Sequence, residues 1–175
     1  MSESSLVLGI QSLVLGQPVA EYAAVFCARA LIFFYIAVYA WLWMSAPKEK
    51  HAAKEGFWTL GLAILLVQII AFVVMRNRPY LDVHGVVALI PPPLTSAFPS
   101  GHTAAAVALV APILYANRTL FWIAAVMAAF VALGRIAVGV HYPTDILGGI
   151  AAGIAAYAMV RWGHRTLRSR KDVGR

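Results

Sequence analysis

Two short groups of polar residues stand at the ends of long apolar segments. One is the tetrapeptide PSGH at residues 99–102, and the other spaces Arg135, His141 and Asp145 at intervals of six and four residues. Titratable groups at membrane depth are energetically costly, so they indicate function before structure. Two imidazoles, a carboxylate and a guanidinium together suit the binding and transfer of a phosphate.

The tetrapeptide predicts an anion site at the start of a helix. Ser100 precedes an apolar segment and is a good N-cap residue. The first backbone N–H groups of a helix lack intrahelical partners, and the helix dipole adds partial positive charge there. Gly101 lets a phosphate approach this backbone closely, and we expect His102, in the first turn, to face the same cavity.

The second group predicts a nucleophile and the residue that orients it. Pro143 suits the first turn of the last apolar segment, so His141 precedes that helix and Asp145 lies just inside it. A carboxylate at this distance can hold one ring nitrogen as N–H and leave the other free to attack. Arg135 can bind phosphate oxygens with its forked guanidinium, and Arg78 brings a second guanidinium to the same side of the membrane.

Each of these residues, taken singly, also has a structural explanation. A histidine at a helix end can pack against lipid headgroups, Arg78 and Arg135 can be lipid anchors, and Asp145 can complement a helix dipole. Their combination at these spacings, on one face of the membrane, favours catalysis over the separate structural roles.

The composition predicts an all-α integral membrane protein. Of 175 residues, 62% are hydrophobic and 12% are charged, and the mean hydropathy is +0.79, whereas soluble domains contain about 25% charged residues. The length suits one membrane-embedded domain, residues 1–175, with about five spans of ~20 residues. The single cysteine, Cys27, excludes a disulfide within the chain and any cysteine-based metal site.

Five apolar segments are expected to form a transmembrane helical bundle. A shorter segment, residues 6–15, is expected to be an interfacial or re-entrant helix, because it is too short to cross the membrane. Small residues in the last segment predict close helix packing. The five expected spans are Val25–Met44, Phe57–Met75, Gly101–Ala116, Thr119–Val140 and Ile146–Val160.

The distribution of charge predicts the orientation of the bundle. Of the 14 Lys and Arg residues, five spans place ten on the side of the C-terminus and four on the side of both polar groups. The positive-inside rule puts the ten in the cytoplasm, including those of a basic tail at residues 161–175. Both polar groups then face outward. This orientation explains the net charge of +7, so we expect no nucleic-acid partner.

The motifs resemble those of the type-2 phosphatidic acid phosphatase superfamily, which are Lys-x6-Arg-Pro, Pro-Ser-Gly-His and Ser-Arg-x5-His-x3-Asp. The second motif is complete, whereas Gly134 replaces the serine of the third and Ala71 replaces the lysine of the first. Arg76 is a candidate source of the missing charge. The loop after Arg78, with its Leu-Ile-Pro and Phe-Pro-Ser runs, looks like that of the bacitracin-resistance branch, the undecaprenyl-diphosphate phosphatases.

The resemblance implies a two-step phosphoryl transfer without a metal ion or other cofactor. His141 would attack the terminal phosphorus and form a phosphohistidine, with Asp145 orienting its ring. His102 would protonate the leaving oxygen and then activate water for the second step. Such chemistry depends mainly on positioning and on charge stabilisation, which guanidiniums can supply.

The resemblance also implies a set of phosphate ligands. Arg76 is an additional candidate phosphate ligand, and the alternative is that its side chain anchors the protein to lipid headgroups. His84, in the outer loop, is a candidate for binding a second phosphate. The favoured alternative is that His84 is simply a loop residue exposed to water. The implied ligands are Arg78, Arg135, Ser100 and the backbone of Gly101.

The activity expected from the resemblance is removal of the terminal phosphate of undecaprenyl (polyprenyl) diphosphate, which recycles the carrier lipid for cell-wall synthesis. Alternatives are a phosphatase for another lipid phosphate (phosphatidate, phosphatidylglycerophosphate or lipid A), a lipid phosphotransferase, and a non-catalytic lipid-phosphate binding or transport protein. The expected partners are the lipid phosphate and the lipids of a bacterial inner (plasma) membrane, with the site on its periplasmic or extracellular face. The sequence predicts no particular oligomeric state.

Overall fold

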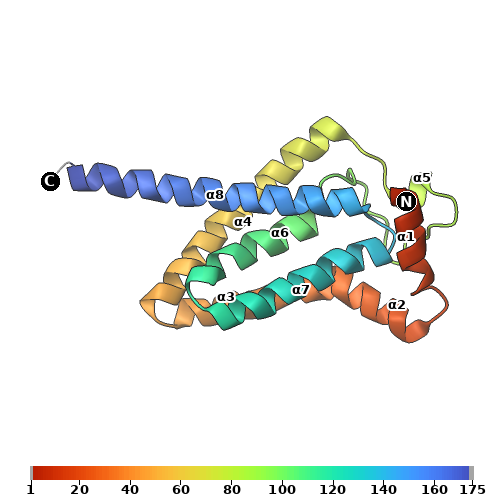
Figure 1. Ribbon diagram of the computed structural model, residues 1–175, viewed down its shortest axis with the longest axis horizontal. Helices are drawn as coiled ribbons and strands as arrows, with labels where there is room; N and C mark the ends of the chain where they lie inside the picture. The colour runs from red at the N-terminus through yellow and green to blue at the C-terminus, as the bar shows by residue number, and fades with distance from the viewer. Residues whose placement is uncertain (1, 174–175) are drawn as a thin grey trace.

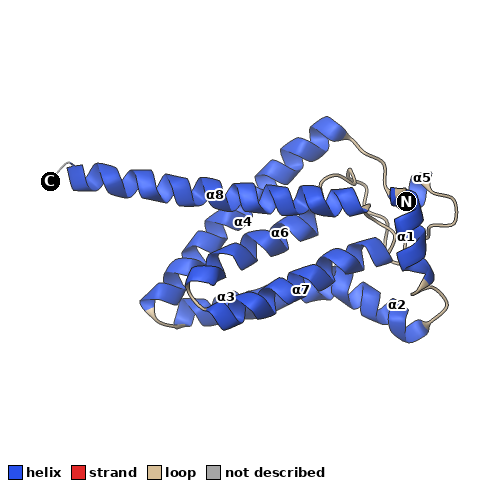
Figure 2. Ribbon diagram, in the orientation of Figure 1, coloured by secondary structure: helices blue, strands red, loops and turns tan. Residues whose placement is uncertain are grey.

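Helices form every regular element of the computed structural model, whose backbone is described for residues 2–173 and whose side chains are described for residues 2–166 (Figures 1 and 2). Within this described part of the chain, four helical segments are long and apolar enough to cross a membrane, and Gly101–Tyr115 is a shorter apolar helix. The predicted all-α membrane bundle with about five spans is confirmed. Of the predicted basic tail, residues 174–175 lie outside the described residues, as do the side chains after residue 166.

The first span is longer than predicted. It begins at Pro18 and continues to Met44, because proline suits the first position of a helix, where no N–H donor is needed. Its middle is irregular, since one π-helical turn interrupts it. Its parts are α2 (Pro18–Val25), η1 (Phe26–Ala30), η2 (Leu31–Phe33) and α3 (Phe34–Met44).

The second span, α4 (Pro47–Val74), ends where the next residue adopts a left-handed backbone (φ 48°). A short helix, α5 (Pro79–Asp82), follows, and Arg78 takes its extended N-cap position. The long loop that follows returns to the segment just after α4, where the Ala97 N–H donates to the Arg76 carbonyl at 2.8 Å. This return brings Arg78 and the PSGH tetrapeptide to the same end of the bundle.

Small residues let the last spans approach one another closely. A Cβ atom added at Gly149 would lie 2.6 Å from the carbonyl oxygen of Ser100, so the close packing predicted for the last segment is present at this crossing. The elements of these spans are α6 (Gly101–Val110), its 3-10 extension η3 (Ala111–Tyr115), α7 (Arg118–Ala137) and α8 (Pro143–Val173).

α7 packs closely on the π-helical turn η1. A Cβ atom at Gly134 would lie 2.8 Å from the backbone nitrogen of Ala28 and 2.9 Å from the Cβ atom of Cys27. The serine of the third motif therefore does not fit here without a shift of the backbone. The glycine at this position is explained by the helix contact.

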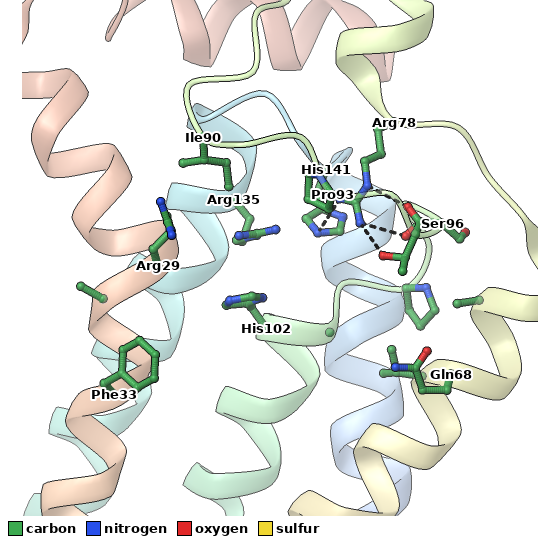
Figure 3. A pocket seen from close by; sticks show the side chains of 16 residues that line it. Arg29, Phe33, Gln68, Arg78, Ile90, Pro93, Ser96, His102, Arg135 and His141 are labelled. Atoms are coloured by element: carbon green, nitrogen blue, oxygen red, sulfur yellow. Dashed lines mark hydrogen bonds between the residues drawn. The ribbon is translucent and has the colours of Figure 1, made fainter.

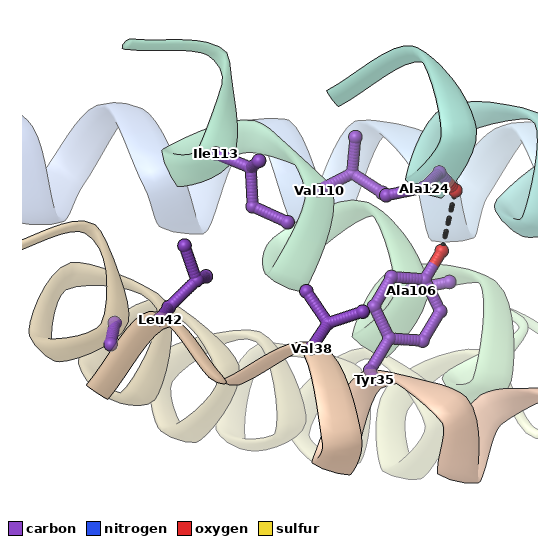
Figure 4. Close-up of a cluster of buried hydrophobic side chains, with 8 residues drawn as sticks. Tyr35, Val38, Leu42, Ala106, Val110, Ile113 and Ala124 are labelled. Carbon is purple, nitrogen blue, oxygen red and sulfur yellow. Dashed lines mark hydrogen bonds between the residues drawn. The ribbon is translucent and has the colours of Figure 1, made fainter. Parts of the chain in front are cut away.

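A buried apolar cluster packs the inner faces of the helices against one another (Figure 4). Tyr35 is buried within it and donates a hydrogen bond of 2.7 Å to the Ala124 carbonyl, which satisfies its hydroxyl. The cluster joins α3, α4, α6, η3 and α7 through Tyr35, Val38, Leu42, Ala53, Ala106, Val110, Ile113 and Ala124. A cavity is left at the end of the bundle that carries the long loops.

The short helix α1 (Glu3–Ser12) lies across the loop end of the bundle (Figure 1). The side chain of Gln11 is buried there and donates to the carbonyls of Val87 and Ala137, at 2.7 and 3.2 Å. Its carbonyl oxygen also accepts from the Val87 N–H at 2.9 Å. These bonds fasten the outer loop to the end of α7, beside the polar residues of the motifs.

Candidate active site

The polar residues of the separate motifs meet in a cavity of about 640 Å³ at the loop end of the bundle (Figure 3). His102 enters it from the start of α6, Arg135 from the end of α7, Arg78 from the N-cap of α5, and His141 from the loop before α8. The convergence predicted from the motif spacing is therefore present in the fold.

The ring of His141 lies between Asp145 and the cavity. Its Nδ1 atom is 3.5 Å from Oδ2 of Asp145, within ion-pair range but without hydrogen-bond geometry. The Tyr142 N–H donates to the same Oδ2 atom at 2.7 Å and holds the carboxylate in place. On the other side of the ring, Nε2 is 3.4 Å from Nη1 of Arg78. Nε2 is therefore the ring nitrogen next to a cavity guanidinium.

Burial sets the protonation state of His141. The residue is only 2% exposed, and loss of hydration lowers the pKa of His141 to about 4, although nearby Asp145 acts in the opposite direction. The imidazole is therefore neutral near pH 7. A neutral ring has the free lone pair that an attack on phosphorus requires.

Arg78 is held rigidly by its surroundings. Nε donates to the Thr95 carbonyl at 2.9 Å, Nη1 donates to the Val140 carbonyl at 2.9 Å, and Nη2 donates to the Ser96 carbonyl at 3.1 Å. A further bond of 3.2 Å joins Nη2 to Oγ1 of Thr95. The side chain thus presents its charge to the cavity in a fixed place, as preorganised electrostatic stabilisation requires.

Arg135, in contrast, is buried and incompletely paired. Its Nη1 donates to the Ala28 carbonyl at 3.3 Å, and its Nε has no partner among the described residues. A buried cation with an unused donor is costly to the fold. An anion in the cavity would supply both the missing hydrogen bond and the missing charge.

Ser100 has the predicted N-cap position, but its side chain makes no capping bond. Its Oγ accepts a hydrogen bond of 3.0 Å from Oγ1 of Thr103, and its N–H donates to the Asp145 carbonyl at 2.9 Å. The residue is fully buried and does not line the cavity, whereas Gly101 does. Of the two residues predicted to form an anion site at the start of α6, Gly101 alone therefore lines the cavity.

The remaining two candidates lie outside this cavity. Arg76 does not line it and instead donates hydrogen bonds to Oδ1 of Asp145 at 2.9 Å and to Oγ1 of Thr144 at 2.7 Å. Its guanidinium also stacks 4.2 Å from the centre of the Tyr142 ring. His84 is exposed in the outer loop and does not line the cavity either.

Four polar residues of the cavity wall were not predicted: Arg29 of η1, Gln68 of α4, and Thr95 and Ser96 of the long loop. The sequence did contain an indication that Arg29 is functional, because it is the only charged residue between residues 25 and 44. One charge in an apolar segment is equally typical of a lipid anchor, however, and only the fold shows that it reaches the cavity.

Positive charge in the cavity comes from guanidiniums. Among the described residues, no three His, Cys, Asp or Glu side chains gather closely enough to hold a metal ion. The arrangement offers a neutral imidazole for attack, a second imidazole for proton transfer, and cations for an oxyanion. It is suited to transfer of a phosphoryl group.

Comparison with known proteins provides independent information. The family model described as PAP2 superfamily matches residues 53–169. The undecaprenyl-diphosphatase BcrC of Bacillus subtilis is 35% identical over 137 residues, which cover 78% of this chain and 66% of that protein, just under two thirds of its length. A decaprenylphosphoryl-5-phosphoribose phosphatase of Mycobacterium tuberculosis is 27% identical over 168 residues, which cover 90% of this chain and 88% of that protein.

Solved structures share the fold. Aquifex aeolicus LpxE superposes with a TM-score of 0.71 at 22% identity, over 89% of this chain and 92% of that one. A transmembrane PAP2-type phosphatidylglycerolphosphate phosphatase from Bacillus subtilis superposes with a TM-score of 0.66 at 20% identity, over 93% of this chain and 86% of that one.

Proposed function

The chain belongs to the PAP2 superfamily, and we propose that it is a phosphatase that removes the terminal phosphate of undecaprenyl or another polyprenyl diphosphate. Similarity to the Bacillus subtilis undecaprenyl-diphosphatase supports this choice of substrate. The proposal assigns residues 1–175 to one membrane-embedded phosphatase domain that returns the carrier lipid to cell-wall synthesis. The lipid phosphate and the surrounding membrane lipid are its partners.

One observation carries the proposal: a neutral, buried His141 presents Nε2 at 3.4 Å from Nη1 of Arg78, in a cavity that His102 and Arg135 also line. In the first step, Nε2 of His141 forms a bond to the terminal phosphorus. The bond from that phosphorus to the bridging oxygen breaks, and the bridging oxygen takes a proton from the imidazolium form of His102, which the negative charge of the bound diphosphate favours.

The second step releases phosphate. His102, now neutral, accepts a proton from water as the water attacks the phosphohistidine, and His141 returns to its starting state. Asp145 orients His141 throughout, while the guanidiniums of Arg78 and Arg135 and the Gly101 backbone stabilise the oxygens of the transferred group. In this mechanism the guanidiniums supply the charge that a metal ion supplies in other phosphatases.

A substrate panel tests the proposed function. Phosphate release by the purified protein in detergent is compared for undecaprenyl diphosphate, phosphatidate, phosphatidylglycerophosphate and a lipid A phosphate, with His141→Ala protein as the blank. We expect the highest kcat/KM for the diphosphate. A higher value for one of the other lipids would reject the substrate, and no release from any of them would favour the binding or transport alternative.

A lipid-linked phosphomonoester is a second candidate substrate. The mycobacterial decaprenylphosphoryl-5-phosphoribose phosphatase matches 90% of this chain, a longer stretch than the Bacillus relative. Adding decaprenylphosphoryl-5-phosphoribose to the panel distinguishes the two candidates, because this lipid carries the reacting phosphate on a sugar rather than on another phosphate.

We also propose that the site faces the periplasm or cell exterior and that the C-terminus is cytoplasmic, because ten of the 14 Lys and Arg residues then lie inside. In a Cys27→Ser background, His84→Cys and Arg118→Cys place a thiol at opposite ends of the bundle. A membrane-impermeant maleimide applied to whole cells with a permeable outer membrane should label the first variant only. Labelling of the second variant alone would reverse the orientation.

A further inference from the structure

The cavity contains a guanidinium that none of the three motifs accounts for. Arg29 lines it together with His102, Arg78 and Arg135, and Figure 3 shows it across the cavity from Arg78, with Arg135 between them. Its side chain is exposed, and no described carboxylate lies within ion-pair distance of it. Arg29 is therefore a cation without a described carboxylate partner, and it lies beside Arg135, a second cation that is incompletely paired.

The backbone under Arg29 is held firmly in place. Ala28 is 1% exposed, and its carbonyl accepts the bond from Nη1 of Arg135 at 3.3 Å. The close approach of Gly134 holds the same turn against α7. π-Helical turns are rare and occur frequently at functional sites. This one fixes the main chain at residues 26–30 while the charged end of Arg29 stays available to a ligand.

The geometry of the reaction tells where the rest of the substrate lies. In an in-line displacement the leaving oxygen is opposite the attacking His141, on the side where His102 donates its proton. A second, apolar groove begins at His102 and Gln68 and is lined by Ile32 of η2 and Ile64 of α4. It offers a path for the lipid chain, and Ile32 comes only three residues after Arg29.

We infer that Arg29 binds the phosphate that stays with the lipid, so that the cavity holds both phosphates of a diphosphate. This inference rests on the proposed function. Space is sufficient, since the cavity of about 640 Å³ corresponds to about twenty water molecules at ~30 Å³ each. In this arrangement Arg78 and Arg135 hold the transferred phosphate, and Arg29, on the far side of Arg135 from Arg78 (Figure 3), holds the phosphate that carries the lipid chain.

Arg29 also contributes to the chemical step. As the bond from the terminal phosphorus to the bridging oxygen breaks, its electron pair stays on that oxygen, which belongs to the departing polyprenyl monophosphate. Negative charge therefore grows on the phosphate beside Arg29 and is then reduced by the proton from His102. A guanidinium at this place stabilises the transition state more than the bound substrate.

The test compares two substrates that differ only in the number of phosphates, geranylgeranyl diphosphate and geranylgeranyl phosphate. For Arg29→Gln we expect kcat/KM for the diphosphate to fall by about tenfold to a hundredfold, the effect of losing one charged hydrogen bond. For the monophosphate the change should stay within about twofold. Arg29→Lys should recover part of the loss. Arg118→Gln removes an exposed arginine at the start of α7, the end away from the cavity, and should leave kcat/KM for both substrates unchanged.

The outcomes separate the inference from the proposed function. If the wild-type protein hydrolyses no diphosphate, the proposed function fails, and the inference fails with it. If the wild-type protein prefers the diphosphate but Arg29→Gln loses activity equally on both substrates, Arg29 serves the transferred phosphate and the inference alone is overturned. Unchanged activity of Arg29→Gln on both substrates would overturn it as well. Retained monophosphate hydrolysis in the variant shows that the protein is folded.

Discussion

Nη1 of Arg76 donates a hydrogen bond of 2.9 Å to Oδ1 of Asp145, and this contact joins the end of the second span to the first turn of the last one. The other end of the guanidinium forms an ion pair with Glu3 of α1. Asp145 is fully buried, and its other oxygen is the one beside His141. Arg76 thus stands behind the carboxylate that orients the proposed nucleophile.

We predict that Arg76→Gln lowers kcat by about tenfold and leaves KM within about twofold, because it removes a support for Asp145 and not a contact with substrate. Loss of a charged bond to a buried carboxylate should also lower the free energy of unfolding by about 1.5–3 kcal/mol. Kinetics and unfolding in mixed micelles measure the two effects. A larger rise in KM than fall in kcat would mark Arg76 as a substrate ligand instead.

Glu3→Gln removes the other ion pair of Arg76 and should have a smaller effect on stability than Arg76→Gln. The Glu3–Arg76 pair is partly exposed, with 33% and 29% of the side chains accessible, so its loss should cost only about 0.2–1 kcal/mol. The carboxylate is charged at neutral pH, since hydrogen bonding by Thr144 and by Arg76 lowers the pKa of Glu3. Equal damage from both variants would show that Arg76 acts through α1 rather than through Asp145.

The two cavity histidines should be essential. His141→Ala removes the proposed nucleophile and His102→Ala the proposed acid, so each should reduce phosphate release by at least about a hundredfold. His84→Ala is the matched control, because this histidine is exposed and lies outside the cavity, and it should keep the wild-type rate. Substantial turnover in either cavity variant would remove that residue from the mechanism.

The buried ring of His141 should make stability depend on pH. In the unfolded chain this residue takes a proton near the ordinary pKa of about 6.5, whereas in the folded protein burial lowers the pKa of His141 to about 4. Its contribution to stability is therefore complete above pH 6.5 and is lost as the pH falls towards 4. Unfolding measured across this range should show a steeper loss for wild type than for His141→Gln, and parallel curves would contradict the burial argument.

The contact of α7 with η1 predicts the effect of restoring the family serine. Gly134→Ser places a Cβ atom 2.8 Å from the backbone nitrogen of Ala28, so we expect a loss of about 1–3 kcal/mol of stability. We also expect lower activity, because Arg135 and Arg29 are the residues that directly follow the two glycine-contact positions. Gly61→Ala is the control, since nothing lies within 4 Å of its added Cβ atom. A stable, fully active Gly134→Ser protein would show that the two helices separate easily.

The helices and the convergence of the motifs were predictable from the sequence, because long apolar runs form spans and the motif residues stand at their ends. The roles of Arg76 and Ser100 were not. The Arg76 side chain is directed by partners 68 and 69 residues away, Thr144 and Asp145, and the Ser100 hydroxyl accepts from Thr103 instead of capping α6. Arg29 reaches the cavity through a π-helical turn, which a pattern of apolar residues does not reveal.

The most direct test of the account is to trap the proposed covalent intermediate. Wild-type protein is mixed with a polyprenyl diphosphate that carries radioactive phosphorus in its terminal phosphate, quenched within milliseconds in alkali, and digested. The account predicts an acid-labile label on the peptide that contains His141, and no label in His141→Ala protein. Label on a different residue, or product formation with no labelled protein at any time, would contradict it.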